Sequence, residues 1–200
     1  MEALLISTGV VALAEIGDKT QLLALVLAAR FRKPLPIILG ILLATLFNHA
    51  FAGVVGRWVA AALGPDLLRG VLGIGFIAMA VWMLVPDGYD EKPDRAPRFG
   101  AFLTTLVAFF LIEMGDKTQV ATVALAAKYA SLVAVVTGTT LGMMISNVPA
   151  VVIGNGIAER LPLKLIHGIA AVVFFVMGLF VLLGQGIGMP GHQGLHPMPT

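Results

Sequence analysis

The 200-residue sequence contains no cysteine and few charged residues. Without cysteine there are no disulfides, thiolate metal ligands, iron–sulfur clusters or cysteine nucleophiles. Charged residues make up 12% of the chain, and the formal net charge is +2. That share is about half of what a soluble domain usually carries. The chain also lacks a basic run long enough to follow nucleic-acid phosphates. These shortages argue against a soluble enzyme and against a nucleic-acid-binding protein.

Apolar residues, in contrast, make up 58% of the chain, and the mean hydropathy is +0.97. A membrane-spanning helix needs about 20 mostly apolar residues. Six such stretches are separated by short segments with charge, proline or glycine; they cover residues 3–29, 35–61, 67–85, 100–127, 131–157 and 163–185. The sequence therefore predicts an all-α integral membrane protein with six transmembrane helices, a charged loop at 86–99 and a flexible tail at 186–200.

Basic residues are unevenly divided between alternate loops. If the N-terminus lies outside, eight lysines and arginines fall in inner loops and three in outer loops. Cytoplasmic loops carry the excess of Lys and Arg in membrane proteins. This predicts that both termini lie outside and that loop 86–99 is cytoplasmic. We do not expect a cleaved signal peptide, because the first apolar run lacks a basic start and contains Glu15 and Asp18.

The two halves of the chain repeat each other when they are offset by 98 residues. The segment EIGDKTQ at 15–21 aligns with EMGDKTQ at 113–119. Further matches pair Gly40 with Gly138 and Phe76 with Phe174. Each repeat holds three predicted spans, so the second repeat enters the membrane from the opposite side. The sequence thus predicts two inverted three-helix repeats, 1–85 and 100–185, an architecture of many secondary transporters.

The acidic residues of the repeated motif fall near the middle of the first and fourth predicted spans. On a continuous helix, Glu15 and Asp18 would project to one face, and Gln21 would continue the row. Two-fold symmetry would bring this row against its counterpart in the second repeat, so that four carboxylates and two amide oxygens converge. The predicted metal ligands are Glu15, Asp18, Gln21, Glu113, Asp116 and Gln119.

Carboxylates inside a membrane are costly, and this cost points to a function. Insertion scales place an Asp at a helix centre at about +2.5 to +3.5 kcal/mol. Ionisable residues there normally mark ion pathways or proton relays. An all-oxygen site suits hard cations such as Ca²⁺, Mn²⁺ or Mg²⁺. Crowded carboxylates repel one another, so protons should occupy the site and leave when a divalent cation binds. The prediction is cation/proton exchange, without catalytic residues or a cofactor.

Other polar residues of the spans have more than one possible use. We expect Gly17 and Gly115 to allow close helix packing, with a loosened helix as the alternative. Each motif lysine either pairs with a carboxylate, serves as an internal cation, or is a structural residue that reaches toward the interface. Each motif threonine either binds the ion or bonds back to its helix. The asparagines and the serine either complete or gate the ion shell, or form hydrogen bonds between helices. The candidates for such a shell or gate are Lys19, Thr20, Lys117, Thr118, Asn48, Ser146 and Asn147.

The duplicated E-x-G-D-[KR]-[ST] motif, placed in spans 1 and 4 of a six-span inverted repeat, resembles the Golgi-type calcium/manganese:proton exchanger family, which includes bacterial manganese exporters of the MneA type. The resemblance covers residues 3–185. It implies export of Mn²⁺ or Ca²⁺, or both, from the cytoplasm in exchange for protons. The motif acids it implies are Glu15, Asp18, Glu113 and Asp116. The compact chain fits a prokaryotic form in the plasma membrane.

Other functions remain open from the residues alone. A divalent-cation channel or uniporter can use the same carboxylates as a selectivity ring, and saturable, proton-coupled flux would separate the two. A membrane enzyme acting on a lipid phosphate would need an Arg-rich or His-containing face that the sequence lacks. An accessory subunit, or an ion-pair network that only joins spans 1 and 4, is less expected because the whole motif is duplicated in register.

Overall fold

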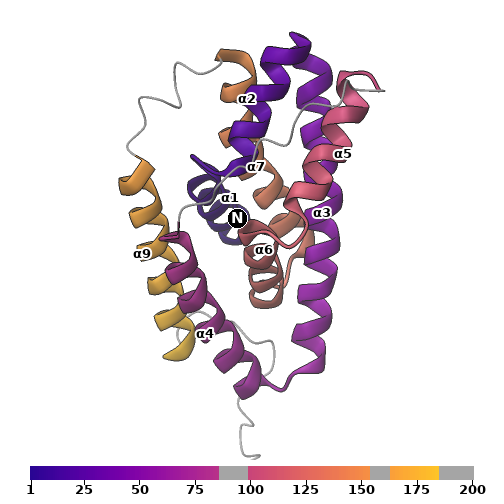
Figure 1. Cartoon of the computed structure of the whole chain (residues 1–200). Coiled ribbons are helices and arrows are strands. Elements are labelled where there is room, and N and C mark those ends of the chain that lie inside the picture. Colours follow the sequence, from indigo (N-terminus) through magenta and orange to yellow (C-terminus); the bar gives the residue numbers. More distant parts are fainter. Residues whose placement is uncertain (86–98, 154–162, 185–200) are drawn as a thin grey trace, which may run out of the picture.

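The computed structural model describes residues 1–85, 99–153 and 163–184, which form helices joined by short segments (Figure 1). Four helices are long and apolar enough to cross a membrane. They are α3 (Pro34–Ala62), α4 (Pro65–Met83), α7 (Leu132–Ile153) and α9 (Leu163–Leu182). The shorter helices are α1 (Glu2–Glu15), α2 (Lys19–Phe31), α5 (Ala101–Glu113) and α6 (Lys117–Lys128). The predicted charged loop, except Phe99, and the predicted tail lie outside the described residues.

The first residues and the exposed side chains of the long helices are typical of membrane helices. Proline occupies the first position of α3 and of α4, where its missing N–H costs no hydrogen bond. Along α3, the large apolar side chains of Phe47, Phe51 and Trp58 are 62 to 70% exposed. Aromatic side chains this exposed would be unfavourable in water but suit contact with lipid. The helical, apolar architecture therefore agrees with the prediction of a membrane protein.

Two of the six predicted spans are not continuous helices, so this part of the sequence-based prediction is wrong. The stretch 3–29 is divided into α1 and α2, and the stretch 100–127 into α5 and α6. The backbone is left-handed at the two motif glycines, with φ of 82° at Gly17 and 81° at Gly115. Glycine adopts this conformation at no steric cost, whereas other L-residues resist it. Three residues at each break, 16–18 and 114–116, therefore leave the helix.

The two breaks have nearly the same backbone geometry. Asp18 has φ −79° and ψ 167°, and Asp116 has φ −80° and ψ 168°. In both copies, the aspartate N–H donates to the glutamate carbonyl oxygen three residues earlier at 3.1 Å. A sequence repeat thus becomes a repeated backbone conformation.

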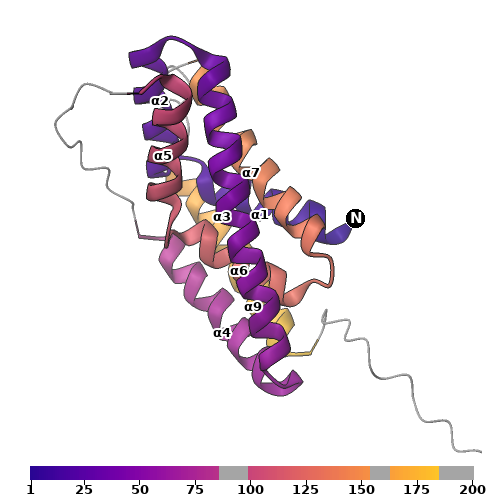
Figure 2. The ribbon, with the colours of Figure 1, turned by 90° about the vertical axis from the view of Figure 1, so that its right-hand side faces the viewer.

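Helices from the two halves of the chain are interleaved. α1 packs along α7, α5 packs along α3, and α4 lies against α9 (Figures 1 and 2). The rings of Phe76 in α4 and Phe174 in α9 lie 6.2 Å apart between centroids. A second apolar cluster includes Ile41 of α3 and Phe109 of α5. The halves therefore share their cores instead of folding as separate bundles.

Paired glycines allow close approach in two of these contacts. A Cβ atom on Gly40 of α3 would lie 2.8 Å from the Thr105 Cβ in α5. A Cβ atom on Gly138 of α7 would lie 2.9 Å from the Ser7 Cβ in α1. Small residues let helix backbones approach in membranes. Both members of each contact are 98 residues from their counterparts, so the two repeats make the same contact reciprocally.

Candidate metal site

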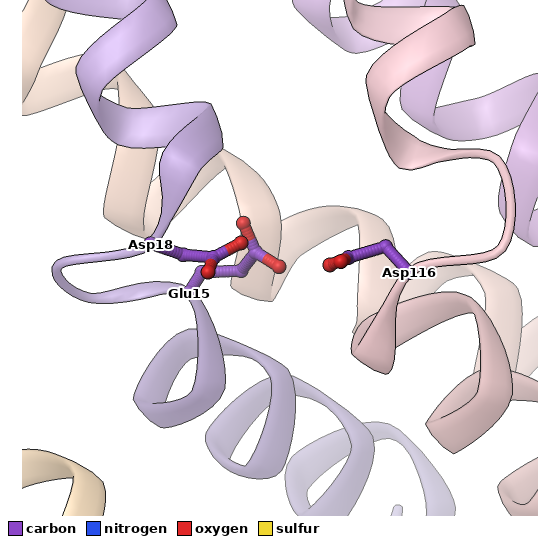
Figure 3. Close-up of side chains that lie close together, drawn as sticks. All are labelled: Glu15, Asp18 and Asp116. Atoms are coloured by element: carbon purple, nitrogen blue, oxygen red, sulfur yellow. The ribbon is translucent and has the colours of Figure 1, made fainter. Parts of the chain in front are cut away.

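The two helix breaks bring carboxylates together at one buried point (Figure 3). Glu15 is the last residue of α1, Asp18 immediately precedes α2, and Asp116 immediately precedes α6. One oxygen from each of these three carboxylates lies within 4.8 Å of the others. The residues are at most 3% exposed. Oxygen ligands at this spacing can close around a single hard cation, whose bonds to oxygen are about 2.0–2.6 Å long.

The convergence was expected, but the reason given for it from the sequence was wrong. Glu15 and Asp18 do not share a face of one helix, because the helix stops between them. Instead, the left-handed turn at Gly17 redirects the chain so that both side chains reach the same point (Figure 3). Neither aspartate uses its side chain to cap the helix it precedes.

The motif glycines provide the break, and at Gly115 the prediction that glycine serves helix packing is wrong. A Cβ atom on Gly115 would meet no atom within 4 Å, so close packing is not what requires glycine there. The positive φ of both Gly17 and Gly115 supplies the requirement. The alternative of a loosened helix is therefore confirmed.

The motif threonines orient the motif glutamates. Thr20 Oγ1 donates to Glu15 Oε2 at 2.6 Å, and Thr118 Oγ1 donates to Glu113 Oε2 at 3.4 Å. Each bond joins the end of one half-helix to the first turn of the next, across the break. Each threonine hydroxyl thus bonds to a motif glutamate and not back to the backbone of its own helix.

Several carboxylate oxygens remain available in the buried site. Glu15 Oε1, Glu113 Oε1 and Asp116 Oδ2 have no hydrogen-bond partner within the described part of the chain. A buried polar atom normally has a partner, because desolvation without compensation is costly. Glu113, the fourth predicted acid, is fully buried at the end of α5 and lies outside the group of three oxygens within 4.8 Å. The unpartnered oxygens suit a ligand-binding role for this site.

The motif glutamines brace the breaks. Gln21 Oε1 accepts a hydrogen bond from the Gly17 N–H at 2.9 Å, and Gln119 Oε1 accepts one from the Gly115 N–H at 2.6 Å. Gln21 Nε2 also donates to the Ser146 carbonyl oxygen of α7 at 3.0 Å. Each amide oxygen thus accepts a hydrogen bond from the unwound backbone, and the ligand role expected from the sequence stays a prediction.

The two motif lysines have different partners. Lys19 forms an ion pair with Asp116, which belongs to the other repeat. Lys117 is buried, and its Nζ donates to the Val85 carbonyl oxygen just after α4 at 3.0 Å. The structure thus shows a motif lysine bound to a carboxylate in one break and a motif lysine bound to a backbone carbonyl in the other.

The remaining candidates for a shell or gate serve contacts between or within helices. Asn48 Nδ2 donates to the Phe110 carbonyl oxygen at 3.1 Å and so joins α3 to α5. Asn147 Nδ2 donates to the Met143 carbonyl oxygen of its own helix at 3.1 Å. Ser146 contributes its carbonyl to the contact with Gln21.

One residue beside the site was missed by sequence reasoning. His167 Nε2 of α9 lies 2.9 Å from the carbonyl oxygen of Ile16, inside the first break. This carbonyl has no partner in a helix, because α1 ends one residue earlier. The only signal in the sequence was a polar residue within an apolar run. His167 thus belongs to the groups that hold the unwound segment.

A buried acidic site between discontinuous membrane helices is characteristic of secondary transporters. The class of protein defined by the fold and the site is therefore a membrane transporter for cations. Comparison with known families agrees: the chain belongs to the family described as divalent cation/proton antiporter GDT1, whose profile matches residues 3–91 and 101–188. It is a transporter and not an enzyme, and its transported partners are divalent metal ions and protons.

Relatives match most of the chain. A protein of Vibrio cholerae serotype O1 named "Putative manganese exporter" is 52% identical over 180 residues, which is 90% of each chain. A GDT1-like protein of Synechocystis is 27% identical over 190 residues, covering 84% of this chain and 91% of that protein. GDT1-like protein 3 of rice is 26% identical over 200 residues, covering 86% of this chain and 71% of the relative. No solved structure matches the chain.

Proposed function

We propose that this protein exports Mn²⁺ from the cytoplasm in exchange for protons, and that Ca²⁺ is the alternative cargo. The observation that carries the proposal is the convergence of Glu15, Asp18 and Asp116 within 4.8 Å in the buried interior. The name of the Vibrio cholerae relative, which is 52% identical, supports both manganese and the direction of transport. Oxygen ligands from carboxylates suit Mn²⁺ as well as Ca²⁺.

In the proposed site, the three converging carboxylates bind the cation and Glu113 completes the coordination. Thr20 and Thr118 hold one oxygen of each glutamate, which leaves the other oxygen for the metal. Protons and the metal compete for the same oxygens, since neighbouring carboxylates cannot all stay charged without a counter-ion. This competition couples cation movement to proton movement.

The proposed topology has six membrane crossings in two inverted repeats. α1 with α2, and α5 with α6, each form one crossing that is interrupted at the site. The matching breaks and the reciprocal contacts of Gly40 and Gly138 support this symmetry. Alternating access then moves one repeat against the other around the shared site. Both termini lie outside the plasma membrane, as the distribution of basic residues predicts.

The proposal is tested in proteoliposomes that contain a pH-sensitive dye. Mn²⁺, Ca²⁺ and Mg²⁺ are added outside in turn, and proton movement is recorded with the membrane voltage clamped. We expect Mn²⁺ to drive the largest proton movement and Asp116→Asn to abolish it. Asp66→Asn is the matched control, because this carboxylate is 93% exposed and pairs only with Arg69 at 3.3 Å in the described residues.

Each alternative gives a different result in this assay. Mn²⁺ entry without proton movement would indicate the channel or uniporter that the sequence left open. A larger response to Ca²⁺ than to Mn²⁺ would reassign the cargo but keep the exchange mechanism. If neither ion moves through folded protein, the proposed transport function is wrong.

A further inference from the structure

Lys19 and the proposed cargo use the same carboxylate. The ammonium of Lys19 pairs with Asp116 Oδ1, while Asp116 also supplies an oxygen to the converging group with Glu15 and Asp18. An aspartate whose charge is balanced by an ammonium is a weaker ligand for a metal ion. A divalent cation in the same place also repels the ammonium strongly, because the dielectric constant is low inside the protein. The pair and the metal therefore oppose each other at Asp116.

A carboxylate is not the only kind of partner that the ammonium of a motif lysine can bind. Lys117 occupies the equivalent position and follows an aspartate with the same backbone conformation, yet its Nζ donates to the Val85 carbonyl oxygen. An ammonium at this position thus has two kinds of partner, a carboxylate of the other repeat or a backbone carbonyl. Lysine carries its charge on a flexible four-carbon stem, which allows such an exchange of partners.

The Lys19 side chain is also less enclosed than the side chain of Asp116. The Lys19 side chain is 22% exposed, whereas the Asp116 side chain is 3% exposed. The ammonium is therefore less enclosed by protein than the carboxylate with which it pairs. The backbone of Asp116 is held at the start of α6, whereas the four-carbon side chain of Lys19 is flexible.

We propose that Lys19 is a built-in competitor of the transported cation: metal binding displaces the ammonium from Asp116, and the return of the ammonium promotes metal release. The inference rests on the proposed function, because it takes Asp116 as a metal ligand. It makes Lys19 a residue that tunes affinity, in addition to any charge balance it provides. The lysine lowers the affinity for the metal and so prevents the site from retaining its cargo.

The test measures equilibrium Mn²⁺ binding to purified full-length protein in detergent, together with exchange in proteoliposomes. We expect Lys19→Met to bind Mn²⁺ at least about tenfold more tightly, equivalent to about 1.4 kcal/mol. Its KM for Mn²⁺ and its maximal exchange rate should both fall, because release becomes slow. Lys117→Met is the matched control with the same change in charge, and its affinity should change by less than about threefold.

A chemical rescue distinguishes the effect of the missing ammonium from an effect of altered folding. The chain has no native cysteine, so Lys19→Cys places a unique thiol that bromoethylamine converts into a lysine analogue. The unmodified variant should bind Mn²⁺ as tightly as Lys19→Met, and the modified protein should return to the affinity of wild type. Because one preparation is compared before and after modification, altered folding cannot produce this pattern.

The outcomes distinguish failure of the proposed transport function from failure of the competitor role of Lys19. If wild-type protein neither binds nor exchanges Mn²⁺, the proposed function fails and the role of Lys19 fails with it. If wild type binds and exchanges Mn²⁺ but Lys19→Met binds equally or more weakly, only the competitor role is overturned and Lys19 is a structural ion-pair partner. Equal tightening in Lys19→Met and Lys117→Met would also overturn it, because general repulsion by nearby charge would then explain both.

Discussion

The left-handed backbone at Gly115 gives the sharpest test of how the site is built. A Cβ atom at this position meets nothing within 4 Å, so the cost of a side chain is conformational and not steric. For an L-residue the left-handed region costs about 1–2 kcal/mol. Asparagine tolerates this region better than alanine, although it is larger. We therefore expect the order of stability and of Mn²⁺ exchange to be Gly115, then Gly115→Asn, then Gly115→Ala, then Gly115→Val.

The measurement is thermal unfolding of the purified protein followed by exchange in proteoliposomes. A loss of about 1–2 kcal/mol corresponds to a fall of roughly 2–8 °C for a chain of this size. Exchange should fall more than stability, because a chain that straightens into a helix moves Asp116 away from Glu15. Gly9→Ala is the control: Gly9 lies inside α1 with nothing within 4 Å of the added atom, and the substitution should be neutral or stabilising.

The order of stability among the Gly115 variants shows whether glycine is required for its backbone conformation or for its small size. If small size were required, Gly115→Asn would be worse than Gly115→Ala, because asparagine is larger. That reversed order, or full activity in Gly115→Val, would refute the assignment of a left-handed break.

Four further outcomes are expected. Thr20→Val should weaken Mn²⁺ binding about tenfold, because the hydrogen bond to the charged Glu15 contributes about 1.5–3 kcal/mol. Thr20→Ser should retain most of the affinity. Equal affinity of the two variants in a binding titration would contradict this expectation. Gly138→Ala should lower the unfolding temperature, because overpacking against α1 costs about 1–3 kcal/mol; an unchanged melting curve would show that the helices can separate freely. His167→Leu should slow exchange more than His167→Gln, which keeps a donor for the Ile16 carbonyl; identical rates would exclude this contact from the mechanism. Finally, the apparent KM for Mn²⁺ should rise as the pH on the metal side falls, because protons compete with Mn²⁺ for the carboxylates. A KM that does not depend on pH would argue against a site shared by protons and Mn²⁺.

Much of the architecture was predictable because a membrane-spanning helix requires a long apolar run, which is visible in the sequence. Four helices, α3, α4, α7 and α9, coincide closely with predicted apolar spans. The offset of 98 residues also predicted that both motif copies would adopt the same structure, and the two breaks agree. These predictions succeed because apolar length and internal repetition are properties of the chain itself.

The breaks were not predictable in the same way. Gly17 and Gly115 lie in runs that are apolar enough to be helical throughout, and a glycine in such a run suits packing as well as a turn. The structure decides between the two uses through φ, and through the absence of any atom within 4 Å of a Cβ on Gly115. The hydrogen bonds from Gly17 and Gly115 to Gln21 and Gln119 were not predicted for the same reason, since they form only where the chain unwinds.

The sequence by itself determined the membrane class, the two equivalent motifs and the acids that meet. It did so because hydrophobic length and charge in an apolar run restrict what a chain can do in a bilayer. Only the tertiary structure decided that Lys19 pairs with Asp116 while Lys117 bonds to Val85, and that His167 reaches Ile16. The two motif copies differ only at Ile16 and Met114, so the motif by itself does not specify these partners, which lie elsewhere in the chain. The packing of the other helices around each copy makes that choice.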